Sequence, residues 1–167
     1  MTTVLAIHIG PSLVHAAVDR DNRIDLIALG DSTPGIPVAL HMTGDGSIQV
    51  GGSDSAIGGS TTGDPVGGDL LTRLADLGAA RIGDRDMSAE RVLAYLVAHV
   101  YARCTRVLDG VPDKVIIVRT AEGPDESVHV AAAHRAHIGE VTLLDETRAW
   151  AAPVSYTHLT LPTNREV

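Results

Sequence analysis

Residues 4–18 read VLAIHIGPSLVHAAV, in which two apolar segments are joined by Gly10-Pro11-Ser12. Apolar runs of this length between turn residues are typical of strands, and so short a connection allows only a hairpin. A third apolar segment, residues 24–29, follows the polar residues 19–22. The sequence therefore predicts a sheet that starts as an antiparallel meander of three strands.

The second half of the chain alternates helical and extended patterns. Apolar residues at three- and four-residue spacing predict a helix over residues 88–109, with Ser88 as its N-cap. Residues 114–118, KVIIV, predict a buried strand, residues 127–137 an alanine-rich helix, and residues 140–144 another strand. Because a strand, helix and strand in this order form a crossover, we expect the last two strands to be parallel.

The region between these halves predicts a second hairpin, a loop and a short helix. Residues 36–42 and 47–50 flank the turn sequence Gly44-Asp45-Gly46. Residues 51–68 are rich in Gly, Ser, Thr and Asp, which favours a loop or a frayed helix; a phosphate-binding P-loop is disfavoured, because the Gly-Lys-Ser/Thr ending is missing. Residues 69–77 predict a short helix ended by Gly78, and residues 78–87 are left as a short connection.

Composition restricts the classes of partner. The chain has 167 residues and a formal net charge of −8, and its Lys and Arg residues do not cluster, which argues against a nucleic-acid partner. Its one cysteine, Cys104, lies among apolar residues, so no internal disulfide can form and we expect a core position. No signal peptide and no apolar run of roughly 20 residues is found, so we expect a cytoplasmic segment without a membrane partner.

Several segments, in the same order, resemble the nucleotide-binding domain of the seventy-kilodalton heat-shock chaperone family. Residues 7–12 resemble its first phosphate motif, and residues 35–51 resemble a hairpin that follows it. Residues 114–118, 127–137 and 141–152 resemble the strand, helix and strand that end the family's first lobe. The resemblance, together with the strand order, implies that residues 1–153 are a ribonuclease H-like lobe of an actin-like domain, an α/β fold with a mixed sheet and flanking helices. We expect the domain to be incomplete in this sequence, because the resemblance implies a second lobe that would follow residue 153.

The resemblance also implies a site for ATP and Mg²⁺. Small residues in a tight turn let backbone N–H groups approach phosphates closely, and Glu146 matches a catalytic glutamate of the family. The alternative interpretation of Glu146 is structural: it is a glutamate at a helix N-terminus, where the helix dipole favours a negative charge. The cofactor-binding positions implied by the resemblance are His8, Gly10, Pro11 and Ser12.

The sequence departs from the family pattern at two of these positions and at one further position. His8 stands where the family has an aspartate that holds hydrated Mg²⁺, a cation that prefers oxygen ligands. Pro11 lacks an N–H donor. Thr72 or Arg73 occupies the position of a lysine that stabilises charge during phosphate transfer. We therefore expect ATP binding with little hydrolysis.

Two functions follow from the resemblance. The first is a chaperone-like ATP-binding protein, with a client polypeptide or co-chaperone as partner. The alternative is a catalytically degenerate actin-fold scaffold associated with secretion. A sugar or acetate kinase of the same superfamily is disfavoured, because those enzymes keep an acidic residue where His8 stands.

Three histidines share the helix predicted over residues 127–137. His134 and His137 are spaced to contact a common metal. Because no partner carboxylate or thiolate is evident nearby, we interpret His129, His134 and His137 as part of a solvated helix face and predict no metal site.

Residues 154–167 break the composition of the chain abruptly. Back-translated, residues 154–163 look like the transposon end and adapter used in preparing sequencing libraries, so we expect a non-native tail. The alternative is a native strand, since residues 155–161 alternate in polarity. Without the second lobe, we expect the chain alone to bind ATP weakly or not at all.

Overall fold

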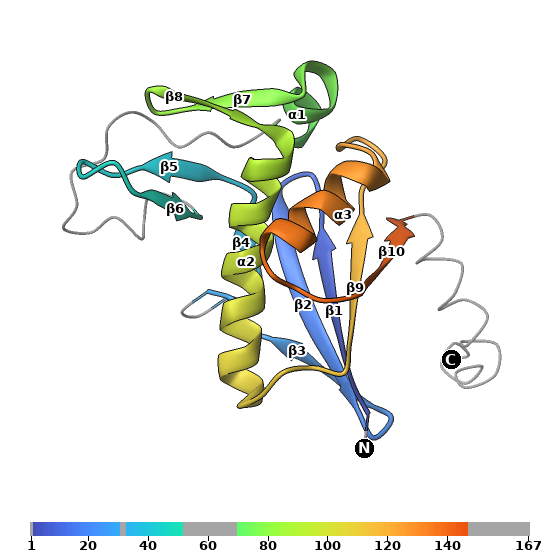
Figure 1. Ribbon diagram of the computed structural model, residues 1–167. Coiled ribbons are helices and arrows are strands. Elements are labelled where there is room, and N and C mark those ends of the chain that lie inside the picture. Colours follow the sequence, from blue (N-terminus) through green and yellow to red (C-terminus); the bar gives the residue numbers. More distant parts are fainter. Residues whose placement is uncertain (1, 31–32, 52–69, 147–167) are drawn as a thin grey trace, which may run out of the picture.

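The computed structural model describes residues 2–30, 33–51 and 70–146 (Figure 1). Within them, the main sheet has six strands, five of which follow one another in the order β10-β9-β1-β2-β3, while β4 pairs separately with β2. The strands are β1 (Thr3–Ile9), β2 (Leu13–Arg20), β3 (Arg23–Ile27), β4 (Ile36–Pro37), β9 (Lys114–Arg119) and β10 (Val141–Asp145).

Strand directions confirm both sequence predictions. The pairs β1–β2 and β2–β3 are antiparallel, as the meander requires, and the pairs β1–β9 and β9–β10 are parallel. The fold is therefore α/β with a mixed sheet, in which β1 has an antiparallel neighbour on one side and a parallel neighbour on the other. Thr3 and Asp113 join the starts of β1 and β9: Thr3 N–H donates to Asp113 Oδ2 at 2.7 Å, and Asp113 N–H donates to Thr3 O at 2.9 Å.

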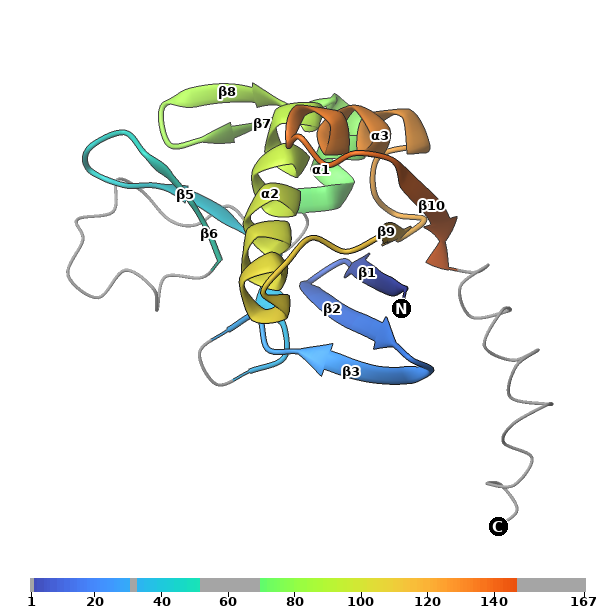
Figure 2. The same ribbon diagram turned by 60° about the horizontal axis from the view of Figure 1, so that its bottom comes forward.

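The two longer helices lie side by side on one face of the sheet (Figures 1 and 2). Helix α2 (Ala89–Leu108) begins after Ser88, whose Oγ accepts the Arg91 N–H at 3.3 Å, and ends at Asp109 in the left-handed region. Helix α3 (Glu126–Arg135) has Asp125 as its N-cap, which accepts the Val128 N–H at 3.3 Å. The predicted N-cap Ser88 is confirmed, whereas α3 begins slightly earlier and ends earlier than predicted.

The core forms between this helical layer and the sheet. Leu5, Ile7 and Ile9 alternate along β1 toward the helices and are fully buried, as the period of two along a strand requires. Helix α2 meets them with its predicted apolar stripe, and Cys104 is buried on the same helix, which confirms its core position. The largest buried side chains of α2 are Leu93 and Leu96.

The opposite face of the sheet is partly exposed in the described part of the chain (Figure 2). Ala6 of β1 is in register with Ala17 of β2 and Leu26 of β3, so these three side chains share that face. Leu26 is 69% exposed, and Ile24, two residues before it, is 73% exposed. Apolar side chains thus remain accessible on the face that α2 and α3 do not cover.

The predicted strand over residues 36–42 is wrong as a single element. It is divided into β4, which pairs with β2, and β5 (Leu40–Met42), which pairs with β6 (Ile48–Val50). The division follows Pro37, which cannot donate to a strand ladder, and the next residue, Val38, donates instead to Ser12 O at 2.9 Å. The predicted turn between β5 and β6 is confirmed, with Gly46 at φ +87°.

Residues 78–87 were expected as a plain connection, and this prediction is wrong. After helix α1 (Leu70–Leu77), the chain forms a hairpin of β7 (Ala79–Ile82) and β8 (Arg85–Ser88). Its turn contains Gly83 at φ +64°, where a Cβ would lie 2.8 Å from Met42 Cβ. The hairpin therefore packs tightly against β5, which a local pattern of four-residue strands could not indicate.

The predicted loop over residues 52–68 and the predicted tail over residues 154–167 lie outside the described residues. Among residues 2–30, 33–51 and 70–146, we find no helix with the length and apolar character needed to span a membrane.

Candidate functional site

The candidate site lies at the edge of the sheet where the parallel strands end. Ile9, Arg119 and Asp145 are the last residues of β1, β9 and β10, and they are in register with one another. Figure 1 shows the three strands ending at the same edge, where the β1–β2 turn also lies. In α/β sheets, ligands commonly bind outside the carboxyl ends of parallel strands.

Two of the predicted site residues meet at this edge. His8 is the penultimate residue of β1, and Glu146 directly follows β10. His8 Nε2 lies 3.7 Å from Glu146 Oε2, and about a third of each side chain is exposed. His8 Nε2 makes no hydrogen bond within the described residues and has almost no accessible surface of its own. The structure thus brings His8, predicted to bind a cofactor, and Glu146, predicted to be catalytic, to within ion-pair distance. Their strands, β1 and β10, are separated by β9.

The turn between β1 and β2 offers fewer amide donors than its resemblance implies. Gly10 N–H donates to Leu13 O at 3.0 Å and is therefore used within the hairpin. Pro11 has no N–H. Ser12 accepts the Val38 N–H through its carbonyl, at 2.9 Å, while its own N–H and hydroxyl make no hydrogen bond within the described residues. Of the three turn residues, Ser12 alone offers a backbone N–H to a ligand.

Gly10 is required by close packing and not by backbone conformation. Its φ is not in the left-handed region, but a Cβ at this position would lie 3.1 Å from Leu13 O and 3.5 Å from His8 Cε1. The tight contact is the one with the Leu13 carbonyl, whereas the distance to the His8 ring would be an ordinary van der Waals contact.

A second ion pair holds the same edge on the other face of the sheet. Arg119 Nη2 lies 2.8 Å from Asp145 Oδ1, and Arg119 Nη1 donates to Pro124 O at 3.3 Å. Sequence reasoning missed this pair, although the position of charged residues at the ends of two predicted parallel strands was a signal for it. Because Asp145 is engaged by Arg119, Glu146 is the carboxylate that faces His8.

Helix α1 carries Thr72 and Arg73, the two positions at which the sequence resemblance would place a lysine. A Cβ placed on Gly123 would lie 3.6 Å from Leu71 Cβ, so α1 lies beside the loop that follows β9. Thr72 is exposed and Arg73 is partly buried. Helix α1 thus lies beside the loop that follows β9, with an exposed hydroxyl at Thr72 and a partly buried guanidinium at Arg73.

The interpretation of three histidines as one solvated helix face is wrong. His129 is 2% exposed, and its Nδ1 lies 2.9 Å from Asp125 O. Burial lowers the pKa of His129 below its ordinary value of 6.5. His137 lies beyond the end of α3 at φ +61°. Of the three histidines, only His134 is an exposed residue of this helix. The reason is that His129 lies on the same face of α3 as Ala132 and Ala133, and this face is buried.

The residues at the edge do not fit a resident Mg²⁺. In the described ranges, no group of three or more His, Cys, Asp or Glu side chains is arranged to hold a metal. Mg²⁺ prefers oxygen ligands, whereas His8 presents an imidazole to Glu146 and Asp145 is paired with Arg119. The described residues of this edge therefore do not form a set of oxygen ligands for a divalent cation.

No protein-family model matches the chain, and no curated protein matches it either.

Proposed function

We propose that the chain is the first lobe of an actin-like protein that binds nucleotide phosphates at the edge formed by His8, Ser12 and Glu146, with little hydrolysis. In this proposal the lobe has the ribonuclease H-like topology, and the ligand is ATP in a chaperone-like protein. The observation that carries the proposal is the strand order β10-β9-β1-β2-β3, which places the β1–β2 turn and Glu146 at one edge.

The order of segments along the chain supports the same proposal. The segments that resemble the first phosphate motif and the end of the first lobe are far apart in sequence, at residues 7–12 and 141–152. Their described parts converge at His8 and Glu146, 3.7 Å apart. A chance resemblance of short motifs gives no reason for this convergence.

Chemistry at His8 supports binding without efficient turnover. A protonated imidazole attracts phosphate oxygens, but an imidazole is a poor ligand for the hydrated Mg²⁺ that accompanies phosphate transfer. The loss of one preorganised electrostatic group typically lowers the rate by about 10²- to 10³-fold. We therefore expect nucleotide occupancy to act as a conformational signal, for example to a client polypeptide or co-chaperone, more than as a source of rapid turnover.

A second candidate is a scaffold of the same fold that has lost nucleotide binding. It is favoured by the turn itself, because the Gly10 N–H is used within the hairpin and Pro11 has none. The two candidates differ in whether the Ser12 N–H has a ligand.

Calorimetric titration of the full-length gene product with ATP, in MgCl₂ and separately in EDTA, tests the proposal. We expect saturable binding in both conditions, because the lobe has no resident Mg²⁺ cluster among its described residues. The variant Ser12→Pro removes the remaining N–H of the turn and should abolish binding, while Ser12→Ala keeps the N–H and should retain most of it. Thermal unfolding of both variants controls for damage to the hairpin. Absence of binding by the wild type, or unchanged binding by a folded Ser12→Pro variant, would support the scaffold instead.

A further inference from the structure

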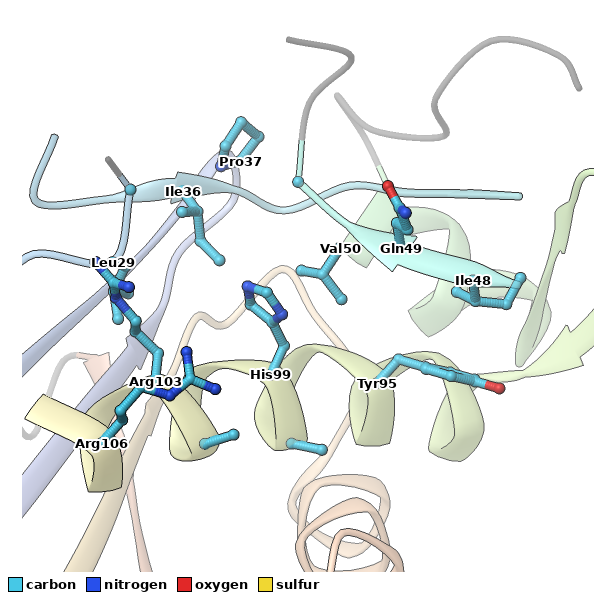
Figure 3. A pocket seen from close by; sticks show the side chains of 14 residues that line it. Leu29, Ile36, Pro37, Ile48, Gln49, Val50, Tyr95, His99, Arg103 and Arg106 are labelled. Atoms are coloured by element: carbon cyan, nitrogen blue, oxygen red, sulfur yellow. The ribbon is translucent and has the colours of Figure 1, made fainter. Parts of the chain in front are cut away.

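A groove separate from the sheet edge lies between α2 and the strands β4 and β6. Its volume is about 790 Å³, within the range of about 300–1,000 Å³ of small-molecule sites. One wall is the face of α2, and the other is formed by residues 29–30, 36–37 and 48–51 (Figure 3). It shares none of its lining with the His8 and Glu146 edge.

The two walls differ in chemistry. Ile36 and Val50 point from the strands toward the helix, so the strand side of the groove is apolar (Figure 3). The helix side presents His99, Arg103 and Arg106, which lie four and three residues apart and therefore share one helix face. The strand and loop residues that line the groove include no ionisable side chain. An apolar wall thus faces a row of basic groups.

The basic groups of this row have no acidic partner within the described chain. Arg103 Nε donates to Ala28 O at 3.3 Å, which fixes the guanidinium at the rim and leaves its terminal nitrogens available. No carboxylate of the described residues lies within ion-pair distance of Arg103 or Arg106. Positive charge left unpaired in a chain of net charge −8 is a local feature that a ligand can use.

The positive charge of this row also contributes to the pKa of His99. Its pKa lies below the ordinary value of 6.5, because the surrounding protein desolvates the ring and because Arg103 and Arg106 repel a further proton. An anion bound between the two arginines would offset that repulsion.

We propose that this groove binds a small organic anion, with its acidic group on Arg103 and Arg106 and its apolar body against Ile36 and Val50. Arg is suited to this role because its planar guanidinium presents several donors to carboxylate, sulfonate or phosphate oxygens. The apolar wall selects for a ligand that carries hydrocarbon or aromatic surface as well as charge.

Two fluorescent probes test the proposal on the whole chain. The probe 1-anilinonaphthalene-8-sulfonate has an aromatic body with a sulfonate, and N-phenyl-1-naphthylamine is the same body without the charge. We expect the sulfonate to bind at least tenfold more tightly than the neutral probe, with an affinity that falls as salt rises. Equal affinity for the two probes would overturn the proposal, because both would then be reporting exposed apolar surface such as that around Leu26.

Substitutions in the groove test whether the probes bind there. Arg106→Gln should weaken the sulfonate about tenfold and leave the neutral probe unchanged, while Val50→Ser should weaken both. Arg81→Gln is the matched control, because Arg81 is exposed on β7 and pairs with Asp86 away from the groove. Sulfonate binding should also raise the pKa of His99, measured by NMR, and should tighten as pH falls through that pKa. An unchanged affinity of a folded Arg106→Gln variant, or no response of His99, would overturn the proposal.

Discussion

His8 Nε2 lies 3.7 Å from Glu146 Oε2, and this pair joins the second-last residue of the first strand to the residue that follows the last described strand. The contact spans the carboxyl edge of β1, β9 and β10. It depends on the register of all three strands, because His8 is paired with Val118 and Val118 with Leu144. The edge is therefore a sensitive place to change charge.

Replacing His8 by Asp should make this edge a cation site. The new carboxylate would lie beside Glu146, and the repulsion between like charges should lower the melting temperature near neutral pH. Mg²⁺ should restore the melting temperature and, in the full-length protein, raise ATP hydrolysis. His8→Asn is the neutral control and should respond to Mg²⁺ no more than the wild type does. A His8→Asp variant with no Mg²⁺-dependent change in melting temperature would contradict the role given to this position.

Alanine substitutions at three glycines should distinguish the cost of backbone strain from the cost of a steric clash. Gly83→Ala should destabilise most, by about 2–4 kcal/mol, because φ is +64° and the added Cβ would lie 2.8 Å from Met42 Cβ. Gly78→Ala should cost about 1–2 kcal/mol, since φ is +71° but the Cβ would meet no atom within 4 Å. Gly110→Ala, with neither problem, should stay within about 0.5 kcal/mol of the wild type. Urea unfolding measures the change in the free energy of unfolding for the three variants. A different order would contradict the close packing of the β7–β8 turn against Met42.

Acid should destabilise the protein through His129. Because burial lowers its folded-state pKa below 6.5, the unfolded chain takes up the proton first as pH falls. Stability should therefore be fully present above about pH 6.5 and decline below it, by at most about 1.4 kcal/mol per pH unit for one proton. His99 shifts in the same direction, so the two are distinguished by variants. His129→Gln should flatten the decline more than His99→Gln does, and equal slopes would argue against a buried, neutral His129.

Cys104 should be unreactive in the folded protein. It is the only cysteine of the chain, it is fully buried, and burial raises the pKa of its thiol to about 11. Since the thiolate is the reactive form, a disulfide reagent at neutral pH should react only as the protein opens. The labelling rate in increasing urea therefore reports the stability of the α2 layer. Rapid labelling without denaturant would mean that α2 does not cover the sheet as described.

The sequence predicted the main sheet well because its elements are decided locally. Apolar runs, turn residues and the Ser88 cap each act within a few positions, and the parallel direction of β9 and β10 follows from the helix between them. The β7–β8 hairpin was missed because its strands are four residues long and are held by contacts with Met42, far away in sequence. The burial of His129 was missed for a similar reason, since an alanine-rich helix has a weak apolar stripe and its orientation is set by packing.

The candidate site was predictable in part. Turn chemistry pointed to residues 10–12, and the resemblance alone pointed to His8 and Glu146, which the structure places at one edge. The use of the Gly10 N–H within the hairpin, and the pairing of Arg119 with Asp145, depend on strand register and could not be read from spacing. The groove on α2 was missed because its two walls are brought together only by the tertiary fold.

The central place of β1 in the sheet has a consequence for synthesis of the protein on the ribosome. β1 precedes the other strands of this sheet in the sequence, and it can pair with β2 as soon as both have left the exit tunnel. Its other edge waits for β9, which is more than a hundred residues later, as the bonds between Thr3 and Asp113 show. During that interval the nascent chain carries an open strand edge, and until α2 is made the apolar side chains of Leu5, Ile7 and Ile9 also lack their helical cover. Slow translation between β2 and β9 should therefore increase aggregation, and ribosome-associated chaperones should bind this stretch.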